Sequence, residues 1–135
     1  MNFTLTDEQR ALTEMVEQFA SVEMAPFAKS WDENHYFPID TLRKAADLGL
    51  GAMYVDPQHG GSGLSRLEAA LVFEKLAAGC VSTTAYLSIH NMVAWMIDRY
   101  GSLALKNHYL PHLATMDRLA SYCLTEANAG SDAAS

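Results

Sequence analysis

The residues best suited to hold a ligand lie near the end of the chain, in TEANAGSD (residues 125–132). Thr125 and Ser131 carry hydroxyl groups, and Gly130 has no side chain that would keep a ligand away from the backbone. The run LASYCLT (119–125) before them is strand-like, so backbone N–H groups and hydroxyls can meet a planar or phosphorylated ligand there. Small polar residues after a strand also serve simply to turn the chain, so both interpretations stay open at this point.

Histidines are the other side chains with chemical capacity. His90 stands beside Asn91 within an apolar helical pattern, where it either makes hydrogen bonds inside the core or lines a ligand pocket. His108 and His112 are four residues apart, which is the spacing of two ligands to one metal ion on a straight helix. Pro111 lies between them and no third ligand stands nearby, so we expect two surface histidines and no metal site.

Several common catalytic motifs are missing from the sequence. It contains no Glu-x-x-His, no His-Glu-x-x-His and no P-loop, which argues against carboxylate di-iron proteins, zinc proteases of that type and P-loop proteins. Gly49-x-Gly51 and Gly61-x-Gly63 each lack the third glycine of a dinucleotide fingerprint. Neither pair follows a strand pattern that would feed a Rossmann turn.

Composition and charge narrow the class of partner. The chain has 135 residues, 50% of them hydrophobic, so it can form one domain with a sizeable core. Nine Lys and Arg stand against 16 Asp and Glu, which gives a net charge of −7, and no basic run is present. We therefore expect neither nucleic acid nor an anionic membrane surface as a partner.

Cysteine usage and the first residues bear on the compartment. Cys80 and Cys123 are far apart and form no CxxC pair, which favours two free thiols in a reducing cytosol. The opening MNFTLTDEQRAL (1–12) contains neither an apolar signal region nor an Arg-rich leader. No apolar run approaches the roughly 18 residues that a membrane span needs. We therefore expect a cytoplasmic protein.

Helices must position these groups, and the sequence predicts about five of them. They cover residues 7–25, 38–48, 65–78, 85–100 and a stretch from 102 that bends or restarts at Pro111. The first begins with a capping-box pair, Thr6 and Gln9, and continues with an apolar stripe of Leu12, Met15, Val16 and Phe19. The fourth is expected to be capped by Ser82 or Thr83 and ended by Gly101.

The fourth predicted helix has the most regular apolar pattern of the chain. Its apolar side chains keep helical spacing for four turns: Ala85, Ile89, Met92, Val93, Met96, Ile97 and Tyr100. We expect this stripe to belong to the core, with a pocket for an acyl chain as the alternative, because Met92 and Met96 adapt to irregular apolar surfaces. Residues 30–37 have no period and are expected to connect the first two helices, and 54–65 form a glycine-rich loop.

After the last helix the strand-like run 119–125 has no second strand in the sequence to pair with. A single strand cannot satisfy its backbone groups. We therefore expect an all-α N-terminal helical domain, an orthogonal or up-and-down bundle over residues 1–118, followed by the first strand of a truncated β-domain over 119–135. On this interpretation the chain is the front part of a longer protein.

Three stretches of the sequence resemble the acyl-CoA dehydrogenase family. YCLTEANAGSD (122–132) is similar to the family's flavin-contacting signature, DPQHGGSGLS (56–65) to the loop between its second and third helices, and TDEQRAL (6–12) to its opening helix. TTAYLSIHNMVAWMIDRYG (83–101) and ASYCLTE (120–126) resemble most the branched-chain members that act in valine breakdown. The resemblance covers the whole chain.

The resemblance implies a three-part protein and a flavin reaction. The family fold is a helical N-terminal domain, a central β-domain and a C-terminal four-helix bundle, and the implied full-length assembly is a homotetramer. The implied reaction is α,β-dehydrogenation of an acyl-CoA thioester, in which a glutamate takes the α-proton, the β-hydride passes to FAD, and electrons leave to an electron-transfer flavoprotein. The flavin supplies the redox chemistry, while the protein orients and tunes it.

The resemblance also assigns roles to residues by position. It places ten residues against FAD: Tyr122, Cys123, Leu124, Thr125, Glu126, Ala127, Asn128, Ala129, Gly130 and Ser131. Thr125 and the backbone beside it would donate hydrogen bonds to the pyrimidine edge of the flavin, and Ser131 would also lie against the CoA part of the substrate. The fourth helix would wall the acyl pocket, with Ser88, His90 and Asn91 near it.

Two departures from the family pattern matter. Ala127 stands where the family usually has a proline, which leaves the turn looser. The catalytic glutamate belongs to the C-terminal domain, so we expect no catalytic residue in this chain, Glu126 included, and no activity from the chain alone. If the source is eukaryotic, the implied compartment is the mitochondrial matrix.

Two other functions stay open from the sequence. One is an acyl-CoA oxidase or a flavin monooxygenase-like relative of the same fold, which reaction of the reduced flavin with oxygen would distinguish. The other is a non-enzymatic acidic helical interaction module, which would carry no chromophore. The unpaired strand argues against the module, because an exposed strand edge invites aggregation.

Overall fold

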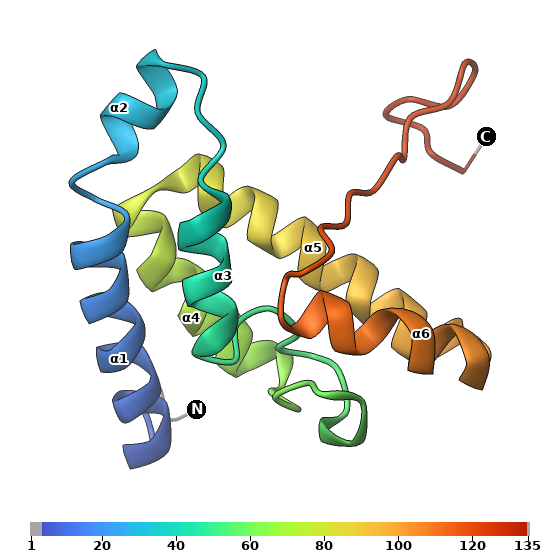
Figure 1. Cartoon of the computed structure of the whole chain (residues 1–135), viewed down its shortest axis with the longest axis horizontal. Coiled ribbons are helices and arrows are strands. Elements are labelled where there is room, and N and C mark those ends of the chain that lie inside the picture. Colours follow the sequence, from blue (N-terminus) through green and yellow to red (C-terminus); the bar gives the residue numbers. More distant parts are fainter. Residues whose placement is uncertain (1–3, 135) are drawn as a thin grey trace.

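The described part of the chain, residues 4–134 of this computed structural model, contains six α-helices and one short 3-10 helix (Figure 1). In chain order they are α1 (Asp7–Glu23), α2 (Ala28–Glu33), α3 (Ile39–Asp47), η1 (Pro57–His59), α4 (Arg66–Gly79), α5 (Val81–Tyr100) and α6 (Leu103–Ala114). The all-α class predicted from the sequence is confirmed. No helix in residues 4–134 is both long enough and apolar enough to cross a bilayer.

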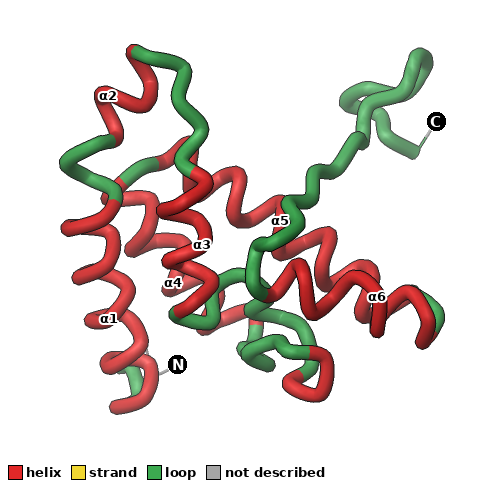
Figure 2. Tube along the Cα trace, in the orientation of Figure 1, coloured by secondary structure: helices red, strands yellow, loops and turns green. Residues whose placement is uncertain are grey.

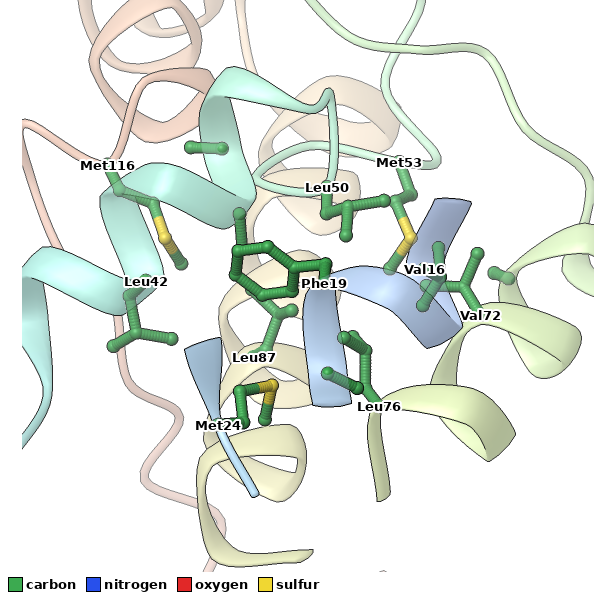
Figure 3. Packing of buried hydrophobic residues seen from close by; sticks show 14 residues of the cluster. Val16, Phe19, Met24, Leu42, Leu50, Met53, Val72, Leu76, Leu87 and Met116 are labelled. Atoms are coloured by element: carbon green, nitrogen blue, oxygen red, sulfur yellow. The ribbon is translucent and has the colours of Figure 1, made fainter. Parts of the chain in front are cut away.

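The helices pack around α4 and α5. α1 lies along α4, α4 contacts α5, and α6 runs beside the second half of α5 (Figure 1). α3 contributes Leu42 and Ala45 to the core that it shares with α1, α4 and α5. In the larger core cluster Phe19 of α1 lies among the side chains of Leu42 and Leu87 (Figure 3). Val16 and Phe19, members of the apolar stripe predicted for the first helix, are therefore core residues.

Side-chain caps mark the starts of α1, α4 and α6. The capping box of Thr6 and Gln9 is present at α1, as predicted. A second capping box, which the sequence reasoning missed, joins Ser65 and Glu68 at the start of α4. Gln9 Nε2 also donates to Glu68 Oε1 at 2.9 Å, so the two helix starts are tied together. Hydrogen bonds from Ser65, and to a smaller extent from Gln9, lower the pKa of Glu68 below its ordinary value.

The start of α5 differs from the prediction, and of the two outcomes predicted at Pro111 in α6, a bend or a restart, the restart is wrong. Cys80, and not Ser82 or Thr83, is the N-cap of α5, and no side chain caps this helix. The Thr83 hydroxyl instead donates to Cys80 Sγ at 3.2 Å. α6 does not restart at Pro111 but runs through it to Ala114. One lost backbone hydrogen bond is tolerated there because the flanking leucines of α6 are buried.

α2 lies partly in a stretch that was predicted to be a connection, residues 30–37. Its six residues span fewer than two turns, too few to show an apolar period. Trp31 nevertheless packs against the larger core cluster and stacks on Phe27, with 5.9 Å between the ring centroids. Tertiary contact therefore holds a helix that periodicity could not reveal.

The strand predicted over residues 119–125 is not formed in the described part of the chain. This segment is drawn as a loop that leaves the helices (Figure 2). The nearest ladder element is one isolated antiparallel bridge between Glu126 and Ala129. A strand is defined by hydrogen bonds to a neighbouring strand, and residues 4–134 offer none at this place.

Candidate functional site

The predicted site residues lie on a segment that projects from the helices, which we call the arm (residues 119–134). The arm leaves from the C-terminal end of α6, beside the middle of α5, and ends in a small turn (Figure 1). In this turn the Glu126 N–H donates to Ala129 O at 3.0 Å, and the Ala129 N–H donates to Glu126 O at 3.3 Å. Residues 121–128 are exposed, whereas Ala129 is buried.

The arm carries hydrogen-bonding groups that are not used within the molecule. Among the described residues, no backbone N–H from Ser121 to Thr125 donates a hydrogen bond, and the hydroxyls of Thr125 and Ser131 make none. A side chain built at Gly130 would meet nothing within 4 Å. The donor set therefore suits a ligand with acceptor atoms along one edge, which can lie close to the backbone.

His90 holds the root of the arm to the helices. Its Nε2 lies 2.9 Å from Leu113 O at the end of α6, and the Ala120 N–H donates to its Nδ1 at 3.1 Å. The ring is fully buried, and this burial lowers the pKa of His90, although its hydrogen bond to Leu113 opposes the shift. His90 was expected near a pocket wall; of the two interpretations, the hydrogen-bonded core residue is correct.

Asn91 is likewise a core residue and not a pocket residue. Its Oδ1 accepts from the Met53 N–H at 2.6 Å, and its Nδ2 donates to Leu50 O at 2.9 Å and to Leu87 O at 3.0 Å. The side chain is fully buried and joins α5 to the loop that follows α3. The expected reach of Asn91 toward an acyl pocket is therefore wrong. Ser88, the third residue of that expectation, is half-buried and donates to Ala85 O at 2.7 Å.

Contrary to the prediction, most of the apolar stripe of α5 does not face the core. The buried positions of α5 are Thr83, Thr84, Leu87, His90, Asn91 and Ala94. Met92 and Met96 are only half-buried, and Tyr100 is 73% exposed. The helix therefore buries its more polar side, whose hydrogen bonds are satisfied, and turns most of its regular apolar stripe outward, although Ile97 packs partly against the smaller core cluster.

The outward stripe forms a groove with the start of the arm, which we call the α5 groove. It has a volume of about 330 Å³ and is lined by Val93, Met96, Ile97, Tyr100, Gly101, Ser121 and Tyr122. Tyr122 is the one predicted site residue that lines it. The alternative pocket role of this stripe rested on Met92 and Met96; of these two, Met96 lines the groove, together with Val93 and Tyr100. The sequence shows the helical spacing of these residues, but it does not show that this side of the helix faces outward.

The histidine pair of α6 makes only local contacts. His108 Nε2 lies 3.2 Å from Arg118 Nη1, and His112 Nδ1 lies 3.8 Å from an Asp117 carboxylate oxygen. Within residues 4–134, no three His, Cys, Asp or Glu side chains come together as metal ligands would. The chemistry that this part of the chain offers is therefore hydrogen bonding by the arm and apolar contact in the α5 groove.

Comparison with known proteins identifies relatives for nearly the whole chain. The family described as "Acyl-CoA dehydrogenase, N-terminal domain" matches residues 6–117. Mitochondrial isobutyryl-CoA dehydrogenase of Bos taurus is 53% identical over 131 residues, which are 97% of this chain and 32% of the bovine protein. The chain thus spans about a third of the length of this relative.

Solved structures share the fold at the same coverage. A glutaryl-coenzyme A dehydrogenase in complex with glutaryl-CoA superposes with a TM-score of 0.92 and 33% identity, over 98% of this chain and 35% of that one. PigA in complex with FAD and proline superposes with a TM-score of 0.91 and 31% identity, also over 98% and 35%. One architecture therefore accompanies different substrates among these proteins.

Proposed function

The chain belongs to the acyl-CoA dehydrogenase family, and from this premise we propose that the whole protein is an FAD-dependent dehydrogenase of short, branched acyl-CoA thioesters such as isobutyryl-CoA. One observation carries the choice of substrate: identity to the bovine isobutyryl-CoA enzyme is 53%, against 33% to the glutaryl-CoA enzyme, over nearly the same residues. The shared fold alone would not separate these two substrates, because enzymes that act on either of them belong to the same family.

The arm fits FAD by its donor set. When bound, FAD supplies the two-electron acceptor that dehydrogenation requires. We assign Tyr122 to Ser131 to FAD contact, with the N–H groups and the hydroxyl at Thr125 on the pyrimidine edge of the flavin. Among the described residues, the N–H groups of Leu124 and Thr125 and the Thr125 hydroxyl make no hydrogen bond, so their binding to FAD would break none. Donors aimed at that edge stabilise negative charge that develops on reduction. Ser131 lies next to Gly130 and would contact both FAD and the CoA moiety.

The α5 groove is the proposed wall of the acyl site. Val93, Met96 and Tyr100 present an apolar surface beside Tyr122, the first residue assigned to FAD. A branched four-carbon acyl group buried there would gain about 0.8 kcal/mol for each methyl or methylene group removed from water. The same surface would exclude water from the carbon atoms that react.

We assign the other parts of the reaction to segments of the whole protein outside this chain, which spans about a third of the length of its bovine relative. We propose that residues 119–135 open the central β-domain, after a helical domain over 1–118, and that the base removing the α-proton lies in the C-terminal domain. Glu126 is held in the turn of the arm by two backbone hydrogen bonds and receives no catalytic role. An electron-transfer flavoprotein as acceptor and a homotetrameric assembly complete the proposal.

Turnover of the complete protein tests this proposal. The substrate loses one hydrogen from Cα and one from Cβ and becomes the 2-enoyl-CoA, and a dye acceptor gains both. We expect a higher kcat/KM with isobutyryl-CoA than with butyryl-CoA or glutaryl-CoA, and no turnover by the 135-residue chain alone. Equal rates for the three substrates would remove the branched-chain assignment. Oxygen consumption in place of dye reduction would favour an oxidase.

A further inference from the structure

We infer that His90 is a positioning residue for the arm, because its ring joins α5, the end of α6 and the backbone of Ala120. The inference rests on the proposed function, since it concerns how the arm is held for FAD. His90 is assigned no contact with FAD or with substrate. It acts through Ala120, at the point where the chain leaves the helices.

The two contacts of the ring define one protonation state. Nδ1 accepts the Ala120 N–H at 3.1 Å, so this nitrogen carries no proton. Nε2 then carries the proton and donates to Leu113 O at 2.9 Å. Both contacts lie inside the molecule, because His90 is fully buried. A neutral ring in one tautomer therefore holds Ala120 relative to two helices.

Ala120 is the place at which the arm can be held. Within the part of the chain that the structure describes, its N–H makes the only hydrogen bond from residues 119–125 to the helices. Ala120 also packs against the smaller core cluster, which includes Leu110 and Leu113. Tyr122, where the assigned FAD contacts begin, follows two residues later. The bond to His90 thus limits the directions in which the assigned residues can extend.

Holding the arm favours ligand binding without any added contact. In the complete protein the arm is the proposed start of the β-domain, so its root at Ala120 sets how the assigned FAD contacts lie relative to the helices. A root that can shift between positions loses this freedom when FAD binds, and the loss weakens binding. A root fixed by His90 has lost part of that freedom before FAD arrives. Removing the acceptor for Ala120 should therefore weaken FAD binding even though every group that touches FAD is retained.

Two substitutions separate this role from simple packing. His90→Asn places Oδ1 near the position of Nδ1 and retains an acceptor for the Ala120 N–H. His90→Gln places its amide near the position of Nε2 and retains only the donor to Leu113 O. Leu113 O also accepts from the Met116 N–H at 3.1 Å, so it is not left unpaired in the Asn variant. Both variants keep an amide in the same buried site, which makes them a matched pair.

The measurements are the FAD dissociation constant of the complete protein and the hydrogen exchange of the Ala120 amide in its FAD-free form. We expect His90→Gln to bind FAD at least about fivefold more weakly than His90→Asn, the effect of losing one internal hydrogen bond. We also expect the Ala120 amide to stay protected in His90→Asn and to exchange quickly in His90→Gln.

Equal dissociation constants and equal protection in the two variants would overturn the inference alone. Failure of the unsubstituted protein to bind FAD would overturn the proposed function and the inference with it. If His90→Gln does not fold, Ala120→Pro removes the same N–H without changing a fully buried residue. Ser121→Pro is its control, because the Ser121 N–H makes no hydrogen bond among the described residues. Equal FAD affinity of these two variants would likewise overturn the inference.

Discussion

At the scale of single residues, the most informative pair is His90 and Asn91, two polar side chains inside a helical core. Both are fully buried, and the hydrogen bonds of both are satisfied by backbone groups of other segments. The sequence left two roles open for His90 and set Asn91 within reach of the acyl pocket. The choice between a core role and a pocket role depends on which side of α5 packs against the other helices, and helical spacing alone does not show this.

Substitution of Asn91 should destabilise the helical domain strongly. Asn91→Ala leaves the buried Met53 N–H without its acceptor and opens a small cavity, so we expect a loss of about 2–4 kcal/mol in the free energy of unfolding. Urea unfolding of the 135-residue chain, followed by circular dichroism, measures it. Asn107→Ala is the matched control on an exposed position of α6 and should change stability by less than about 0.5 kcal/mol. Equal losses in the two variants would show that the buried hydrogen bonds contribute little.

His90 should make the stability depend on pH. Burial lowers its pKa in the folded protein below the ordinary value of 6.5. As pH falls below 6.5, the unfolded chain takes up a proton that the folded protein resists, so the free energy of unfolding decreases until the folded pKa is passed. Urea midpoints from about pH 8 to about pH 5 should therefore decline less in His90→Gln than in the unsubstituted chain. Identical slopes would contradict a buried neutral ring.

At the scale of elements, periodicity and capping residues predicted most helices, and tertiary contact decided the rest. The capping box of Thr6 and Gln9 and the apolar stripe behind it located α1 within about two residues of its observed bounds. α2 was missed because six residues carry no measurable period. The apolar side of α5 was identified, but its assignment to the core was wrong. A regular apolar stripe indicates that this side of the helix packs against another apolar surface. That surface need not belong to the same helical bundle.

The approach of two elements at Gly51 gives an element-scale prediction. A Cβ at this position would lie 2.3 Å from Ala114 O at the end of α6, closer than any contact allows. Gly51→Ala must push the loop after α3 away from α6, so we expect a loss of about 1–3 kcal/mol in urea unfolding. Gly130→Ala is the matched control, because a Cβ there meets nothing within 4 Å. A Gly51→Ala variant as stable as Gly130→Ala would contradict the packing described here.

At the scale of the whole molecule, the helices serve as a base from which the arm and the α5 groove face outward. The chemistry of the arm was visible in the sequence as hydroxyls and a glycine after a strand-like run, but those residue types alone could not separate a ligand site from a turn. The resemblance of YCLTEANAGSD (122–132) to a flavin signature favoured the site. The position of the groove could not be predicted, because it depends on α5 and the arm meeting across 21 or more residues of sequence.

The most direct measurement is the visible absorption spectrum of the complete protein before and after anaerobic addition of isobutyryl-CoA. We expect a flavin band that bleaches, because the two hydrogens removed from the substrate reduce the bound FAD in the absence of any other acceptor. Butyryl-CoA and glutaryl-CoA should bleach it more slowly. A flavin band that stays unchanged with isobutyryl-CoA would contradict the substrate, and a protein without a flavin band would contradict the proposed function as a whole.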